Sequence, residues 1–216
     1  MENGPVSSCA VTAAPRSLPW VALGLLAGLA LGLGACRYTP ALAGTPLDGD
    51  PAPDFALRDQ DGQLVQLAAL RGRPVVLTFL YTQCPDVCPL TADKLRRVAD
   101  ALGPDAARVA FVAVSTDPDH DDAAAAQAFV TQHGLTGRLH FLLGSQAELA
   151  PVWAAYYIYA APAPPTPHHD AASPPGLAIH TDALYVLDRQ GRLRTFLRSD
   201  FEPAALTATL RTLLAE

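Results

Sequence analysis

Residues 74 to 90 read PVVLTFLYTQCPDVCPL, an apolar run that stops at two cysteines. The run Val75 to Leu80 is rich in β-branched and aromatic side chains, which is typical of a strand buried on both faces in the middle of a mostly parallel sheet. Cys84 and Cys88 therefore follow the carboxyl end of a strand, where open α/β sheets place their functional sites. The stretch predicts an α/β domain with its chemistry at this edge of the sheet.

A helix is expected directly after the cysteines. It should begin at Pro89, because a proline at the first helical position loses no hydrogen bond, and it should end at Gly103. Its apolar positions repeat at spacings of three and four residues: Leu95, Val98, Ala99 and Leu102. Since the N-terminus of a helix is the positive end of its dipole, the Cys88 thiolate is expected to form more readily than that of a free thiol.

The spacing of the two cysteines allows two kinds of chemistry. With three residues between them, the sulfurs can form a disulfide or bind one metal ion, and the spacing alone does not choose between these. A purely structural disulfide would close a very short loop and remove little entropy from the unfolded chain. We therefore interpret Cys84 and Cys88 as a redox-active or metal-binding pair.

The same residues carry a resemblance to a known family. Residues 79 to 89, FLYTQCPDVCP, together with Asp117-Pro118 and His180, resemble the Sco/SenC family of copper proteins. The resemblance covers about Pro53 to Leu214 and implies a thioredoxin-like fold, with a central mostly parallel sheet flanked by helices. It also implies a copper chaperone that delivers copper to, or reduces the cysteines of, the binuclear copper site of cytochrome c oxidase.

The resemblance implies a copper site made of Cys84, Cys88 and His180. Two thiolates suit Cu(I) and an imidazole accommodates Cu(II), so such a site holds the ion in either oxidation state. The resemblance also places Asp117 close to the metal-binding loop, behind the copper ligands. An Asp-Pro pair is a common start of an ordinary turn as well, so both interpretations of Asp117 stay open.

The remaining elements follow in chain order. Asp61-Gly62 indicates a hairpin added at the amino-terminal side of the domain, and Ser145 to Glu148 has the pattern of a capping box. Further strands are expected at 108–115, 139–143, 183–187 and 193–197, and further helices at 122–133, 145–156 and 203–214. The proline-rich loop from Ala160 to Gly176 is longer than ordinary connections. It contains His168 and His169, which are expected to be incidental, because flexible histidines bind metals weakly unless they are preorganised.

Composition limits the function classes. The chain has 216 residues, half of them apolar, and a formal net charge of −6 with no basic run, which argues against nucleic-acid binding. Of the four cysteines, Cys9 and Cys36 precede the domain. In an oxidising compartment Cys84 and Cys88 therefore have each other or a metal ion as partner.

The amino-terminal segment, residues 1–36, is predicted to be a signal or membrane anchor. Leu18 to Ala35 is almost wholly apolar, which fits an uncleaved anchor. It also fits a lipoprotein signal ending at a lipidated Cys36, or a cleaved signal with the small-residue site 41–43. All three interpretations place the domain outside the cytoplasm. Residues 37–53 are rich in Pro, Gly and Ala and are predicted to be a flexible tether to the copper-binding domain, 54–216.

Two rival functions use the same residues. One is a metal-free thiol-disulfide oxidoreductase that uses the Cys84 and Cys88 pair, and the other is a copper-sensing or redox-signalling module. The copper-carrier interpretation implies as partners the copper-site subunit of cytochrome c oxidase, other copper carriers or thiol reductants, and the membrane.

Overall fold

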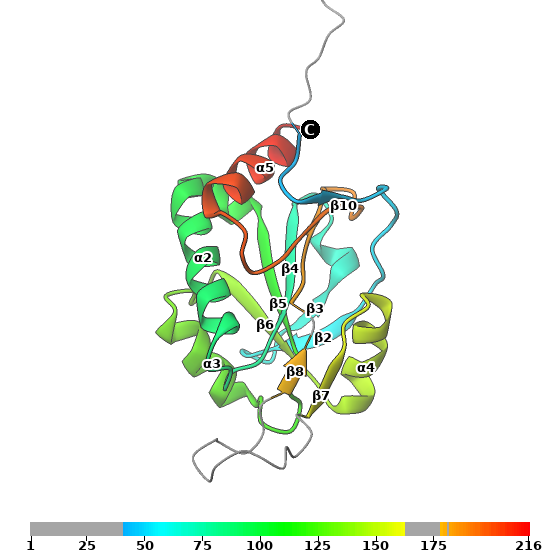
Figure 1. Cartoon of the computed structure of the whole chain (residues 1–216), viewed down its shortest axis with the longest axis vertical. Helices are drawn as coiled ribbons and strands as arrows, with labels where there is room; N and C mark the ends of the chain where they lie inside the picture. Colours follow the sequence, from blue (N-terminus) through cyan, green and yellow to red (C-terminus); the bar gives the residue numbers. More distant parts are fainter. Residues whose placement is uncertain (1–40, 163–177, 181) are drawn as a thin grey trace, which may run out of the picture. The chain divides into compact units, whose positions relative to one another are not determined.

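The computed structural model describes residues 41–162, 178–180 and 182–216, and Ala41–Glu216 form one compact unit. An eight-stranded sheet runs through this unit in the order β1-β10-β9-β4-β5-β6-β2-β3 (Figure 1). Its strands are β1 Thr45–Pro46, β2 Ala56–Asp59, β3 Leu64–Gln66, β4 Val75–Leu80, β5 Ala110–Ser115, β6 Leu139–Leu143, β9 Leu184–Leu187 and β10 Leu193–Leu197. A second small sheet pairs β7 Ala160–Pro162 with β8 Ala178–His180.

Four α-helices lie in the described part of the chain: α2 Val87–Leu102, α3 Ala123–Gln132, α4 Gln146–Ala155 and α5 Pro203–Ala215. Two 3₁₀ segments, η1 Leu67–Leu70 and η2 Gly103–Arg108, connect elements. The helices α2, α3 and α5 lie on one side of the sheet, and α4 lies on the other (Figure 1). This layered arrangement confirms the predicted thioredoxin-like α/β fold.

The central strands set where the site lies. β4 pairs in parallel with β5, from Val75 opposite Ala110 to Leu80 opposite Ser115, and β5 pairs in parallel with β6. The carboxyl ends of these strands therefore meet at one edge. The other pairs of this sheet are antiparallel, including β4 with β9 and the predicted hairpin of β2 and β3, so the sheet is mixed around the parallel strands β4, β5 and β6.

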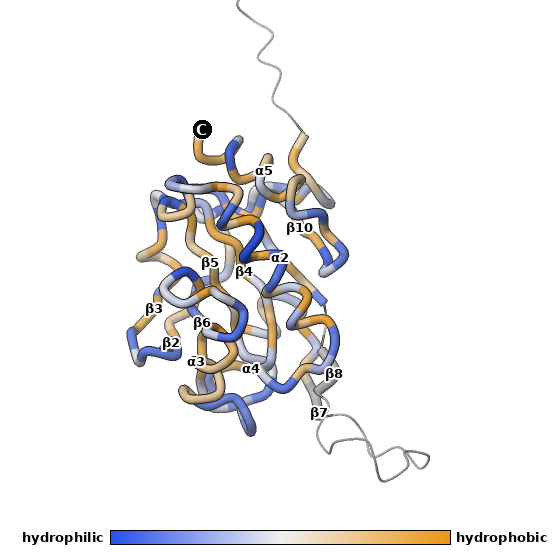
Figure 2. The backbone as a smooth tube through the Cα atoms, turned by 90° about the vertical axis from the view of Figure 1, so that its left-hand side faces the viewer, coloured by the Kyte–Doolittle hydropathy of each residue, from blue (hydrophilic) through white to orange (hydrophobic). Residues whose placement is uncertain are grey.

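The central strands are buried on both faces, as predicted. Val76 and Leu80 of β4 pack into one apolar cluster, whereas Val75, Leu77 and Phe79 pack into a second one on the opposite face. This alternation follows from the two-residue repeat of a strand. The backbone of these strands carries mostly hydrophobic residues, whereas many of the connecting loops are hydrophilic (Figure 2).

Local signals predicted most element ends well. Asp122 caps α3 by accepting a hydrogen bond from the Ala125 N–H, and Ser145 and Glu148 form the predicted capping box of α4. The predicted start of α2 was wrong, because the helix begins at Val87 and Pro89 is its third residue. The reason is that none of the first four N–H groups of a helix has an intrahelical acceptor, so a proline loses nothing at its third position either.

The last residues of the predicted tether are folded onto the domain. Thr45 and Pro46 pair with Phe196 and Thr195 of β10, and the Thr195 hydroxyl donates to the carbonyl of Ala43 at 2.6 Å. Further along, the Ala52 N–H donates to the Gly191 carbonyl at 3.0 Å. Because these backbone groups are paired, residues 41–52 add an edge to the sheet, which differs from the predicted flexible segment 37–53. Residues 37–40 lie outside the described residues.

The predicted membrane segment cannot be followed in the structure. Leu18 to Ala35 and the candidate lipidation site Cys36 lie outside the described residues. Within residues 41–162, 178–180 and 182–216, no helix has the length and hydropathy needed to cross a bilayer.

Candidate metal centre

The two cysteines lie where the chain passes from β4 into α2. Cys84 is in the connecting loop, where its N–H donates to the Tyr81 carbonyl at 3.4 Å, and Cys88 is the second residue of α2. Both side chains are buried, with exposed fractions of 7% and 0%. Their neighbours Gln83, Pro85 and Asp86 are exposed, so the sulfurs lie under a thin surface loop.

Cys84 and Cys88 touch each other. The Cys88 N–H donates to Cys84 Sγ at 3.4 Å, and no disulfide joins them. The hydrogen bond with Cys84 and the loss of solvent both raise the pKa of the Cys88 thiol. The expectation from the helix dipole, an easily formed Cys88 thiolate, is therefore wrong for this dithiol. A metal ion that binds here must displace the thiol protons.

Tyr81 is a further residue of this site that was not predicted. Burial raises the pKa of its hydroxyl, and so does a hydrogen bond between the Tyr81 and Cys84 side chains. Tyr81 is 3% exposed and follows β4 directly. Tyr81 has no separate signal in the sequence, so only the fold shows that its side chain meets that of Cys84.

Asp117 lies in the neighbouring loop, after β5. Its carboxylate is buried, and the Nδ1 atom of His120 lies 2.9 Å from each of its two oxygens. This hydrogen bond, together with the charge of Asp117, raises the pKa of His120. The charge of Asp117 also contributes to the raised pKa of Tyr81. The carboxylate is therefore close enough to act electrostatically on the loop 81–86, which carries Cys84 and is called the cysteine loop below.

Asp121 is the carboxylate that contacts the cysteine loop directly, and it was not among the predicted residues. Its Oδ1 accepts from the Thr82 N–H at 2.8 Å and the Thr82 hydroxyl at 2.6 Å, and its Oδ2 accepts from the Ser115 hydroxyl at 2.5 Å. Burial raises the pKa of Asp121, against the lowering effect of these bonds. The signal in the sequence that could have indicated Asp121 is the pair Thr82 and Ser115, because hydroxyl groups at the ends of neighbouring strands need a hydrogen-bond acceptor.

His180 is the predicted ligand from the far end of the chain. Its backbone ends β8 and pairs with Ala160 of β7, while the placement of its side chain lies outside what the structure describes. Within the described part of the chain, no three His, Cys, Asp or Glu side chains are arranged to hold a metal ion. The set Cys84, Cys88 and His180 therefore stays a prediction. His168 and His169 also lie outside the described residues.

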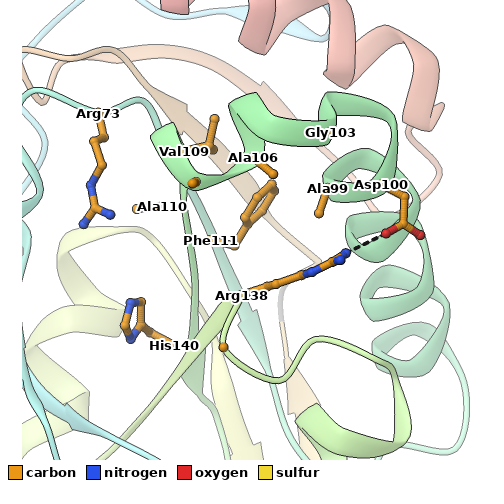
Figure 3. Close-up of a pocket in the computed structure, with 12 residues that line it drawn as sticks. Arg73, Ala99, Asp100, Gly103, Ala106, Val109, Ala110, Phe111, Arg138 and His140 are labelled. Carbon is orange, nitrogen blue, oxygen red and sulfur yellow. Dashed lines mark hydrogen bonds and ion pairs between the residues drawn. The ribbon is translucent and has the colours of Figure 1, made fainter.

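A cavity of about 560 Å³ lies at the opposite edge of the sheet, where β4, β5 and β6 begin. Figure 3 shows Arg138 reaching toward Asp100, with Arg73 and His140 on the other side of the cavity. Arg138 binds Asp100 at 2.6 Å, and His140 Nδ1 lies 2.8 Å from a carboxylate oxygen of Asp59. These two side chains therefore have acidic partners, and Arg73 adds a further cation to the lining. The cavity is separate from the cysteine pair.

Comparison with known proteins identifies one family. Residues 45–215 match the family model described as SCO1/SenC. Over 140 residues the chain is 34% identical to a mouse protein named Protein SCO2 homolog, mitochondrial. That match covers 64% of this chain and 52% of the mouse protein, so the chain spans about half the length of this relative.

Solved structures agree with this match. The structure of Bradyrhizobium japonicum ScoI with copper bound is 32% identical, with a TM-score of 0.66, and the match covers 76% of this chain and 100% of that one. The solution structure of apo Sco1 from Thermus thermophilus is 27% identical, with a TM-score of 0.64, and the match covers 82% of this chain and 98% of that one. The likeness therefore extends over the whole described domain.

Proposed function

The chain belongs to the SCO1/SenC family, and we propose that it is a copper protein that takes part in assembly of the binuclear copper site of cytochrome c oxidase. The observation that carries the proposal is the pair of buried thiols, Cys84 and Cys88, in contact beyond the end of β4. The copper-bound ScoI of Bradyrhizobium japonicum, at 32% identity, supports copper as the ion.

Cys84 and Cys88, together with His180, would hold the copper. Their donor set fits, because two thiolates satisfy Cu(I) and an added imidazole accommodates Cu(II). Copper is cargo in this function, so it has to enter and leave. The exposed loop residues Gln83, Pro85 and Asp86 leave the sulfurs close to solvent, where an acceptor can approach them.

A second candidate is reduction of disulfides in the same acceptor. The hydrogen bonds that join Cys88 to Cys84 favour it, because they keep the two residues in contact. Cys84 and Cys88 would be oxidised to a disulfide, while the disulfide of the acceptor takes up the two electrons and two protons and becomes a dithiol. This function needs no metal, so it is distinguished from copper transfer by the need for His180.

Copper titration of the reduced full chain in mild detergent tests the proposal. We expect one copper ion per chain, and loss of this binding in Cys84→Ser, in Cys88→Ser and after oxidation of the pair, because a disulfide has no thiolate to donate. Cys9→Ser is the matched control, since Cys9 precedes the domain, and it should bind as the unaltered chain does. Undiminished binding in the double variant Cys84→Ser, Cys88→Ser would contradict the proposal.

The domain is further proposed to be tethered to a membrane and to lie outside the cytoplasm. The apolar run 18–35 and the sequence Leu-Gly-Ala before Cys36 support a lipoprotein signal. The Ala43 N–H donates to Thr209 and its carbonyl accepts from Thr195, which counts against cleavage directly after Ala43. Mass analysis of membrane-extracted protein should find residues 1–35 absent and Cys36 lipidated. An intact chain would instead support an uncleaved anchor.

A further inference from the structure

Asp121 joins the ends of two neighbouring strands. Ser115 is the last residue of β5 and stands opposite Leu80, the last residue of β4, so the Ser115 hydroxyl and Thr82 approach the same carboxylate from adjacent strands. Three donors converge on this side chain, which is 7% exposed. A buried carboxylate with three short hydrogen bonds holds its donors firmly, because releasing it would leave a charge and its donors unpaired.

Thr82 is held twice. Both its N–H and its hydroxyl donate to the same oxygen of Asp121, at 2.8 and 2.6 Å, so its backbone and its side chain are both restrained. Cys84 follows two residues later and is linked back to the end of β4 by the bond from its N–H to the Tyr81 carbonyl. The position of the Cys84 sulfur therefore depends on a short stretch of chain that Asp121 fixes at Thr82.

Asp121 differs from its acidic neighbours Asp117 and Asp122 in the residues that its carboxylate binds. Asp117 is paired with the partly exposed His120, and Asp122 caps α3 through the Ala125 N–H. Of these three described carboxylates, that of Asp121 accepts hydrogen bonds from the loop that carries Cys84, whereas those of Asp117 and Asp122 bind His120 and the Ala125 N–H. Asp121 is therefore placed to hold the loop by hydrogen bonds, whereas Asp117 affects it through its charge.

We propose that Asp121 is a positioning residue of the dithiol site: by holding Thr82 it sets Cys84 against Cys88. Its effect on copper binding rests on the proposed function, whereas its effect on the loop does not. The carboxylate holds the loop through its hydrogen bonds with Thr82, and its charge also contributes to the raised pKa of Cys88. Removing the Asp121 carboxylate should let the loop open, so that the Cys84 thiol becomes exposed and the two sulfurs move apart.

Alkylation of the metal-free, reduced full chain tests the loop directly. Iodoacetamide labelling, followed at Cys84 by peptide mass analysis, separates this thiol from the others. Asp121→Ala should react at least about tenfold faster, because local opening governs the access of reagent to a buried group. Asp121→Asn should react at an intermediate rate, since its amide oxygen still accepts from the Thr82 N–H. Asp122→Ala removes a carboxylate next to it and should leave the rate unchanged.

A smaller change keeps the test valid if Asp121→Ala fails to fold. Thr82→Val removes the hydroxyl that donates to Asp121 and keeps the backbone N–H, and it should also speed labelling of Cys84. Combining Thr82→Val with Asp121→Asn should give an effect that differs from the sum of the two, because both changes alter hydrogen bonds of the same carboxylate. Equal rates in the unaltered chain, Asp121→Asn and Thr82→Val would overturn the proposal.

Copper affinity supplies the second readout. We expect Asp121→Ala to bind copper about 10 to 100 times more weakly, the usual effect of removing a group that orients metal ligands, and Asp122→Ala to bind normally. Normal copper binding by Asp121→Ala would overturn the positioning role and leave the proposed function intact. If the unaltered chain bound no copper through Cys84 and Cys88, the proposed function would fail, while the labelling rates would still decide the role of Asp121.

Discussion

Replacing Gly44 by alanine tests whether the chain before residue 54 is folded onto the domain. Gly44 has φ +91°, a conformation that L residues adopt at a cost of about 1 to 2 kcal/mol. A Cβ at this position would lie 2.3 Å from the Phe196 carbonyl oxygen and 2.8 Å from Leu197 Cγ. Since a backbone oxygen in a paired strand cannot yield easily, the segment around Gly44 must move away from β10.

This movement has a cost that follows from the contacts. It would break the bond from the Ala43 N–H to Thr209, at 2.8 Å, and the bond from the Thr195 hydroxyl to the Ala43 carbonyl, at 2.6 Å. Each such bond contributes about 0.5 to 1.5 kcal/mol. Together with the backbone strain, Gly44→Ala should lower the free energy of unfolding by about 2 to 5 kcal/mol. Urea unfolding of the full chain, followed by tryptophan fluorescence, measures this loss.

Gly49→Ala is the matched control. Gly49 has φ +78° and no atom within 4 Å of the added Cβ, so it carries the backbone strain alone. Its loss should stay near 1 to 2 kcal/mol, about the strain of a positive φ. Equal losses for the two variants, or none for Gly44→Ala, would refute the packing of residues 41–46 against β10.

Three further predictions concern the site and its support. His180→Ala should weaken Cu(II) binding at least about tenfold and Cu(I) binding less, while disulfide reduction stays unchanged. Visible spectra and copper titrations measure the binding, and an insulin-reduction assay measures the reduction. Unchanged Cu(II) affinity together with lost reduction would contradict the prediction. NMR titration should find the pKa of His120 above 6.5, and Asp117→Asn should lower it. Because the pKa is raised in the folded protein, the pair stabilises the fold fully at a pH below the pKa of the unfolded state, and this stabilisation is lost as the pH rises through the pKa of the folded state. If Asp117→Asn left the titration of His120 unchanged, the pairing would be excluded. Trp153→Phe removes the bond from Nε1 to the Ser115 carbonyl, at 2.9 Å, and should lower the free energy of unfolding by about 1 to 2 kcal/mol in urea, whereas an unchanged midpoint would mean that the bond contributes nothing.

Most of the fold could be predicted because its signals are local. β6 and β10 have the predicted bounds, and β4 fills the predicted run Val75 to Leu80. An apolar run of six residues between turn residues leaves few alternatives to a buried strand. The start of α2 was missed by two residues, because a proline is tolerated at several positions of a first helical turn.

Composition misled the prediction for the segment 41–52. Pro, Gly and Ala are frequent in linkers, yet here Gly44 permits a close approach to β10 that a side chain would prevent. The partners that hold the segment are Thr195 and Thr209, about 150 residues later in the chain. Nothing within the segment itself indicates that these hydroxyl groups are available.

The sequence by itself determined the class of the domain and the place of the cysteine pair directly after a buried strand. A buried strand followed by Cys84 and Cys88 is a contiguous pattern, and residues close in sequence remain close in any fold. The tertiary structure alone decided how that pair is surrounded, since Asp121 meets Thr82 only because β4 and β5 lie side by side and end together. It also decided that the pKa of the Cys88 thiol is raised, because the hydrogen bond with Cys84 and the burial of the side chain both depend on how the loop packs.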